Sequence, residues 1–177
     1  MLKKYEFTNE TKKVEDYLGN FYTLHRIKAL KDFGDVKKGD LGGWLEKESN
    51  LSHEGNCWVY GNAVVYNSHA MVFGDAKVYD SAQVFGNAKV YDAQVYGNAQ
   101  VYGSAGVFGR NAMVFGNAQV YGHAQVFGHA HVFGNAQVYD NCEVYGNAQV
   151  YDDAQVYGDA WVCDNSVVCG DTEVLGD

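Results

Sequence analysis

Four histidines in the later part of the chain are the side chains best suited to acid–base chemistry, because imidazole titrates near neutral pH. They are His69, His123, His129 and His131. His129 and His131 are two residues apart, so both can point outward near one edge, where a weak metal site would be the alternative to a plain surface role. No carboxylate partner or lid-forming insertion accompanies any of them. We therefore expect no metal and no cofactor, and His123, His129 and His131 are the catalytic candidates if the chain is an enzyme.

The charge is distributed unevenly along the 177 residues, whose net charge is −9. Residues 1–50 are nearly neutral, whereas no Lys or Arg follows Arg110 and residues 140–177 carry nine acidic side chains. Phosphate contacts are made by cations, so we expect no direct nucleic-acid binding by this half. The acidic residues either keep the surface solvated or form a docking surface for a basic partner.

The sequence also contains no apolar run of the roughly 18 residues that a membrane helix needs and no apolar leader, so we expect a cytoplasmic protein.

From Cys57 onward the chain repeats one six-residue unit, written GNAQVY at residues 116–121 and again at 146–151. Val marks the phase in twenty slots from Val59 to Val174. A small residue, usually Ala, stands two positions before Val, and Gly, Asp or Asn stands two positions after it. These last residue types tolerate the left-handed backbone of a tight corner. The unit therefore predicts a short strand, Ala-Gln-Val-Tyr, followed by a two-residue corner, and residues 57–177 form one repeat domain.

The connection between successive strands follows from which side chains share a face. In a chain of tight hairpins the residues that flank each turn point to the same side, so inside and outside would exchange at every turn. A parallel coil keeps Val and Ala inside throughout. We therefore predict an all-β fold, a single-stranded parallel β-helix. The unit resembles the hexapeptide repeat of known β-helices, which implies three units to each coil of a triangular prism and hence six to seven coils from twenty slots. Three changes of spacing, after Val65, Val90 and Val107, are expected to be absorbed as corner bulges.

The residue after Val is aromatic in most slots and points outward, and taking every third slot sorts these rings into three vertical ladders. The first face carries Tyr60, Tyr79, Tyr96, Phe115, Phe133 and Tyr151; the second carries Tyr66, Phe85, Tyr102, Tyr121, Tyr139 and Tyr157; the third carries Phe73, Tyr91, Phe108, Phe127 and Tyr145. Stacked rings and rows of Gln stabilise in-register strands, so the ladders are expected to support the coil. The alternative is a flat aromatic platform that binds a protein or a glycan.

The same phase places the four cysteines. Cys57 and Cys142 occupy inward positions, and Cys163 and Cys169 lie on different outer faces. Without a CxxC pair or converging ligands, all four are expected to be free thiols with no zinc site.

Both ends of a β-helix expose core and unpaired backbone. Residues 1–56 are expected to be a small β-rich cap with strands at residues 5–7 and 23–30, and Trp44 and Trp58 in the core beneath it. Helical spacing of apolar residues at positions 14–21 is interrupted by Gly19-Asn20, which disfavours a helix. At the other end the repeat degrades, and either charge blunts the edge or the coil continues into a second subunit as a tail-to-tail homodimer. The charges are those of Asp159, Asp164, Asp171, Glu173 and Asp177.

Residues 24–44, LHRIKALKDFGDVKKGDLGGW, and residues 50–60, NLSHEGNCWVY, resemble a family of bacterial and phage hexapeptide-repeat proteins that includes the YdcK-like proteins. The resemblance implies a left-handed β-helix; a right-handed triangular helix is otherwise open. It also implies a phage or prophage relation. A transferase label in this family rests on likeness to hexapeptide acyltransferases, and a fold does not fix an activity.

We expect a non-catalytic binding or scaffold protein that presents its aromatic ladders and acidic C-terminal coils to a protein partner. The alternatives are an acyltransferase, an acidic inhibitor that mimics nucleic acid, and a glycan-binding module. The expected partner surface consists of Tyr139, Tyr145, Tyr151, Tyr157, Asp140, Asp152, Asp153 and Asp159.

Overall fold

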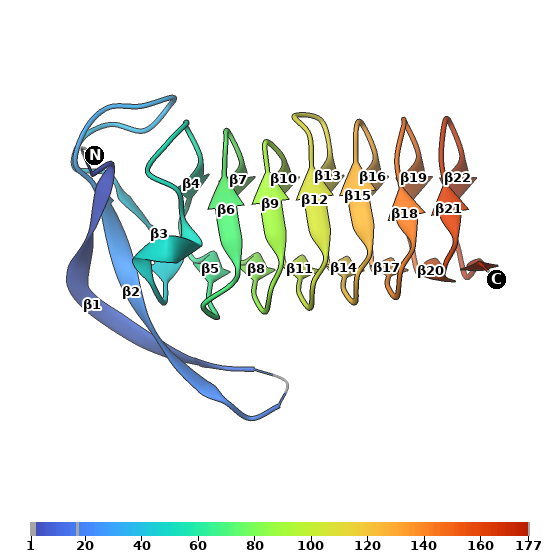
Figure 1. Ribbon diagram of the computed structural model, residues 1–177, viewed down its shortest axis with the longest axis horizontal. Helices are drawn as coiled ribbons and strands as arrows, with labels where there is room; N and C mark the ends of the chain where they lie inside the picture. The colour runs from blue at the N-terminus through green and yellow to red at the C-terminus, as the bar shows by residue number, and fades with distance from the viewer. Residues whose placement is uncertain (1–2, 17, 177) are drawn as a thin grey trace.

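A computed structural model describes residues 3–16 and 18–176 and shows a solenoid built from short parallel strands (Figure 1). A long antiparallel hairpin, which we call the arm, leaves the N-terminal end of the solenoid, and the C-terminus lies at the opposite end. The strands form three sheets, one along each side of the prism. The predicted all-β, single-stranded parallel β-helix is therefore confirmed.

The three predicted faces are three sheets whose strands follow one another every third element. The first face consists of β4 (Trp58–Val59), β7 (Lys77–Val78), β10 (Gln94–Val95), β13 (Met113–Val114), β16 (His131–Val132), β19 (Gln149–Val150) and β22 (Val167–Val168). The second face consists of β5 (Val64–Val65), β8 (Gln83–Val84), β11 (Gln100–Val101), β14 (Gln119–Val120), β17 (Gln137–Val138), β20 (Gln155–Gly158) and β23 (Glu173–Gly176). The third face consists of β6 (Met71–Phe73), β9 (Lys89–Tyr91), β12 (Gly106–Phe108), β15 (Gln125–Phe127), β18 (Glu143–Val144) and β21 (Trp161–Val162). From residue 57 onward the described part of the chain has seven, seven and six rungs on the three faces, in agreement with the predicted six to seven coils.

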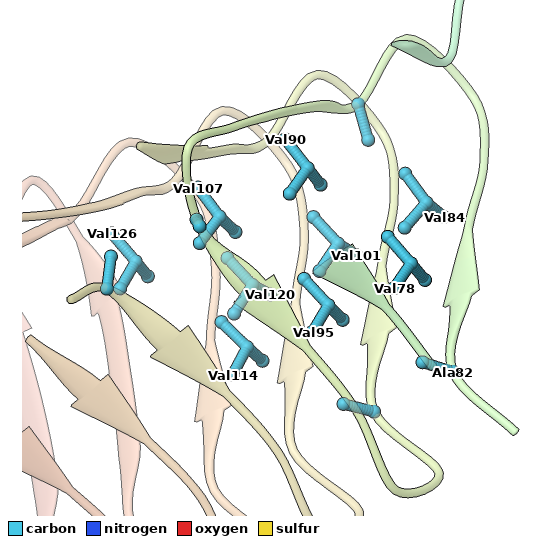
Figure 2. Close-up of a cluster of buried hydrophobic side chains, with 14 of the residues drawn as sticks. Val78, Ala82, Val84, Val90, Val95, Val101, Val107, Val114, Val120 and Val126 are labelled. Atoms are coloured by element: carbon cyan, nitrogen blue, oxygen red, sulfur yellow. The ribbon is translucent and has the colours of Figure 1, made fainter. Parts of the chain in front are cut away.

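Val and Ala fill the interior, as the repeat predicts. The inward Val and Ala side chains from coil to coil belong to one continuous buried cluster, and Figure 2 shows rows of these Val side chains inside the coils. Each parallel pair among the strands of these three faces places Val directly on Val, for example Val101 on Val120. Burial of these aliphatic side chains is the main source of stability, because each removes apolar surface from water at roughly 25 cal/mol per Å².

The corners adopt the left-handed backbone that the Gly, Asp and Asn pattern predicts. Asp140, Asp152 and Asp164 have φ values of 61°, 58° and 59°, and Gly116 has a φ of 71°. We call the corner that follows a strand of the first face a first corner, and we name the second and third corners in the same way. The changes of spacing leave the strand register intact, since Val95 pairs with both Val78 and Val114, as expected if the irregularity is confined to corners.

The N-terminal segment forms the arm and then joins the solenoid. β1 (Tyr5–Glu15) and β2 (Phe21–Ala29) pair antiparallel, so both predicted strands exist but are longer than expected. β3 (Leu41–Leu45) pairs antiparallel with β2 and parallel with β5, and a short 3₁₀ helix, η1 (Glu48–Asn50), follows it. One rung of the second face therefore lies within the predicted cap, and the division at residue 56 stays a prediction.

The arm covers the first rings of the second face, which corrects the expectation that they point into solvent. Tyr66 and Phe85 are only 2% and 7% exposed, because Leu24 and Tyr22 pack over them. Trp58 is buried, as predicted, but Trp44 is only half-buried and lies beneath the Lys12 ammonium, whose Nζ is 4.8 Å from the ring centroid. Around residues 14–21, where the sequence disfavours a helix, strand flanks the turn on both sides; Tyr17 lies outside the described residues.

The two ends of the core differ in how their backbone and inward side chains are covered. At the N-terminal end the fully buried Lys4 donates from Nζ to the carbonyl of Cys57 at 2.9 Å and to that of Gly55 at 3.4 Å, so backbone acceptors there are satisfied. Burial lowers the pKa of Lys4. At the C-terminal end Ser166 and Thr172, which replace the inward Ala, are exposed. Within the described residues no helix has the length and hydropathy needed to cross a membrane.

Candidate functional site: ladders, acidic corners and the C-terminal coils

The aromatic ladder is a continuous stack on the second face, and on the first face it is a continuous stack from Tyr79 to Tyr151. On the first face Tyr96 stacks on Phe115 with centroids 4.8 Å apart and planes within 1°, and Phe115 stacks on Phe133 in the same way. On the second face the stack from Phe85 to Tyr157 has spacings of 4.9 to 5.2 Å. In-register strands impose this spacing, which suits stacking worth about 0.5–1.5 kcal/mol per pair.

Hydrogen bonds lock the second ladder to its neighbouring row of Gln. Tyr121 donates its hydroxyl to Oε1 of Gln137, one coil further on, at 3.2 Å, and Tyr102 donates to Gln119 at the same distance. Tyr157 donates to the Glu173 carboxylate instead, which raises the pKa of the tyrosine. Burial raises the pKa of Tyr121 to about 12. Ring and amide together therefore form a cross-coil brace.

Stacking decides which part of the rings can meet a partner. Parallel planes about one rung apart cover both faces of an inner ring and leave edges and hydroxyl groups outward. Tyr91 is the most exposed ring of the described ladders, at 41%, and it lies where the third ladder is irregular. There Phe108 folds over Gly106, where an added Cβ would collide with the ring. The inner rungs thus support the coil and do not offer flat faces for a sugar to stack on.

The structure separates the predicted partner surface into three regions. Tyr139 and Tyr157 lie on the second face, with Asp140 and Asp159 at the corner that follows it. Tyr151 lies on the first face, whose corner carries Asp152 and Asp153, and Tyr145 lies on the third. The acidic side chains therefore surround the C-terminal coils at several corners instead of lining one side. Asp177 lies outside the described residues.

Several of these carboxylates also have a structural role. Asp140 accepts the backbone N–H of Gly158 at 3.2 Å, and Asp152 accepts that of Gly170 at 3.3 Å. The corner Asn side chains form amide chains from coil to coil, and Asn135 donates to Asp153 at 2.9 Å. The sequence signal for this role is the 18-residue offset that places a corner Asp beneath a corner Gly.

The last coil exposes apolar side chains where the repeat has polar or stacked ones. Trp161 and Val167, 70% and 56% exposed, occupy positions at which earlier coils carry Glu143 and Gln149. Leu175, 62% exposed, continues the second ladder after Tyr157. The loss of aromatic residues after Val predicts an altered end, but the partner surface predicted from the sequence omits Trp161 and Val167. Alignment of the repeat on Val is the signal that finds them.

The histidines do not come together as an acid–base site. His123 is exposed at the second corner, while His129 at the third corner meets Nδ2 of Asn111 at 3.1 Å. His131 on the first face contacts the ring of Phe115 edge-on, with centroids 6.4 Å apart. His69 hydrogen-bonds with Ser68 at 3.2 Å. Within residues 3–16 and 18–176, no three His, Cys, Asp or Glu side chains are grouped so as to hold a metal ion.

The cysteines lie where the repeat places them. Cys57 and Cys142 are buried, Cys163 and Cys169 are partly exposed, and all four are free. Burial raises the pKa of Cys142 to about 12, so its thiol is not activated as a nucleophile.

Known proteins with the same repeat agree with this architecture. The family described as "YdcK Beta solenoid repeat" matches residues 93–109, 148–164 and 154–170. The "Uncharacterized acetyltransferase YdcK" of Escherichia coli (strain K12) is 39% identical over 62 residues, which are 33% of this chain. That match spans only 19% of the relative's length. The chain therefore carries, over part of its length, a repeat similar to that of the YdcK-like solenoid proteins, and its parallel sheets have the solenoid architecture that this repeat describes.

Proposed function

We propose that the protein is a non-catalytic binding protein whose rigid solenoid presents its C-terminal coils to a protein partner. The observation that carries the proposal is the exposure of three apolar side chains on the last coil, Trp161 on the third face, Val167 on the first and Leu175 on the second. Exposed apolar groups rimmed by polar residues are typical of interaction sites. The phage or prophage relation, a cytoplasmic location and a choice between monomer and homodimer stay predictions.

The apolar group is not accounted for by the stability of the coil. Elsewhere the outward position before Val carries a polar or small residue in most coils, and the neighbouring rings cover one another by stacking. A Trp that is 70% exposed gains little from its own coil. Burial of such a side chain against a partner supplies the kind of aromatic anchor on which interfaces depend.

The negative charge around the last coil favours a basic partner. Asp152, Asp153, Asp159 and Asp164 are exposed, and no Lys or Arg lies beyond Arg110. Opposite charges steer association and set specificity, so the partner surface is expected to be basic, with apolar positions that meet the side chains of the last coil. Binding should therefore weaken as salt rises.

The test is affinity capture from a host lysate at low and high salt, with two variants of the bait. Trp161→Gln restores the residue type common at this position, and the triple variant Asp152→Asn, Asp153→Asn, Asp159→Asn removes charge while it keeps acceptor oxygens for the corner hydrogen bonds. A partner of this surface should bind wild type and be lost with either variant. Each single loss is expected to be tenfold or more, which is about 1.4 kcal/mol.

The matched control is Met71→Gln, which changes an exposed apolar side chain on the third face far from the C-terminal coils. It should capture the same proteins as wild type. If Trp161→Gln and the triple variant also capture an unchanged set, the C-terminal coils are not the binding surface and the proposal is wrong.

Acetyl transfer is the second candidate, because the relative from Escherichia coli is named an acetyltransferase. The described surroundings of His123, His129 and His131 supply amide and ring contacts and no carboxylate that would orient a general base. A rise in the melting temperature with acetyl-CoA, lost in a His129→Ala or His131→Ala variant, would favour this candidate over the binding protein.

A further inference from the structure

A hollow on the first face, near the N-terminal end, lies where the aromatic ladder is interrupted. Its volume is about 760 Å³, which is in the range of small-molecule sites. The loop at residues 33–36 contributes Asp35 to one wall, and the first coils contribute the rest. The coil residues that line it are Tyr60, Gly61, Asn62, Lys77, Tyr79, Asp80, Ser81 and Gln94.

The interruption has a definite cause. Tyr60 donates its hydroxyl to Asp35 at 2.8 Å, and its ring stands at 87° to that of Tyr79 with centroids 6.4 Å apart. On its other side Tyr79 stacks on Tyr96 at 4.8 Å with planes within 3°. Tyr79 thus has a parallel ring, Tyr96, on one side and a perpendicular ring, Tyr60, on the other. An aromatic face therefore borders the hollow, unlike the inner rungs.

The charged groups of the hollow are already paired with one another or with backbone. Nζ of Lys77 lies 2.9 Å from Asp35, and this contact lowers the pKa of the Asp35 carboxyl. Asp80 accepts the backbone N–H of Gly97 at 3.2 Å. Two carboxylates and one ammonium leave a single net negative charge, and a charged ligand would have to compete with the existing partners of these groups.

The remaining polar groups are neutral. Asn62 and Ser81 lie at the first corner, and neither side chain makes a hydrogen bond within the described part of the chain. Oε1 of Gln94 accepts the hydroxyl of Tyr79 at 3.1 Å, so its amide N–H groups point elsewhere and can donate. The hollow therefore combines one apolar ring face with several neutral donors and acceptors.

We propose that this hollow binds a neutral sugar, one or two pyranose rings in size. One side of a pyranose ring is a patch of C–H groups that packs on an aromatic face, and its rim of hydroxyl groups both donates and accepts hydrogen bonds. Tyr79 would carry the ring, while Asn62, Ser81 and Gln94 would take the hydroxyl groups. The site is at the opposite end of the solenoid from the proposed protein-binding coils, so the two proposals stand or fall separately.

The experiment uses the full chain and the neutral saccharides glucose, galactose, N-acetylglucosamine, cellobiose and lactose. Saturation-transfer NMR detects binding, and calorimetric titration measures the affinity. We expect at least one saccharide to bind, with transfer strongest to the C–H protons of one ring side. Tyr79→Leu, which keeps an apolar side chain in the ladder but removes the flat ring, should weaken binding about tenfold or more.

Two further variants separate the site from the fold. Phe115→Leu likewise removes a flat ring, two rungs along the same ladder, and should bind sugar as wild type does. Asn62→Ala combined with Ser81→Ala alters exposed corner side chains that the ladder does not need, and it should also weaken binding. The proposal is overturned if no saccharide binds at concentrations on the order of 10 mM, if Tyr79→Leu and Phe115→Leu weaken binding equally, or if tetramethylammonium binds there in preference to every sugar.

Discussion

The corner glycines show how one residue position determines whether coils can stack. Gly116 has a φ of 71°, and a Cβ added there would lie 3.0 Å from the backbone nitrogen and oxygen of Gly134 in the next coil. The position therefore needs Gly for two reasons, the left-handed backbone and the close approach of a neighbouring corner. Asp is accepted at other corners because its side chain bonds the next coil, as Asp152 does with Gly170.

A pair of Ala substitutions separates these two reasons. Gly170→Ala meets the strained φ of 66° with nothing within 4 Å of the new Cβ and should cost about 1 kcal/mol. Gly116→Ala adds the collision with Gly134 and should cost clearly more, about 2–3 kcal/mol in total. Urea unfolding of both variants measures the difference. Equal costs would mean that corner stacking contributes nothing beyond backbone conformation.

The aromatic ladder of the second face makes the stability of the protein depend on the protonation of a tyrosine. Tyr121 has a pKa raised from 10.0 to about 12, chiefly because burial in the stack disfavours the phenolate. An unfolded chain loses this proton near pH 10, whereas the folded chain holds it until about pH 12. The folded state therefore binds more protons between these values, so stability is unaffected below about pH 10 and falls as the pH rises through this window.

The Tyr121→Phe variant removes the titrating group and keeps the ring. It should lose less stability than wild type between about pH 9 and pH 11.5 in urea unfolding experiments. Phe115→Leu, which removes no titrating group, should show the wild-type pH dependence. Identical slopes for wild type and Tyr121→Phe would contradict the account of the ladder as a protonation-sensitive brace.

At the level of elements, the repeat predicts most of what the solenoid shows. Val at every slot sets the phase, and three slots to a coil follow from the resemblance, so the amino-acid sequence alone assigns the members of the three ladders. The arm is different. The burial of Tyr66 depends on Leu24 and Tyr22, which carry no repeat and reach the second face only through the docking of a hairpin. Handedness comes from the resemblance alone.

For the whole molecule, the candidate sites are harder to predict than the fold. The hollow at Tyr79 depends on Asp35, 25 residues before Tyr60 in the chain and part of an irregular loop. No periodicity places that loop against the first coil. At the other end the charge is predictable from composition, but its distribution over several corners depends on the coil geometry. The six-residue repeat therefore determines the solenoid. The candidate sites are determined by contacts between the repeat and segments that do not share it.

A rigid solenoid that engages a protein through its C-terminal coils should be protected there when the partner binds. The most direct measurement is amide hydrogen exchange of the full chain, alone and with the protein captured by wild type and lost with Trp161→Gln. We expect added protection over residues 155–176, where β20 to β23 lie, and unchanged exchange in the arm and around Tyr79. Protection confined to the arm or to the first coils, with none over the last coil, would contradict this expectation.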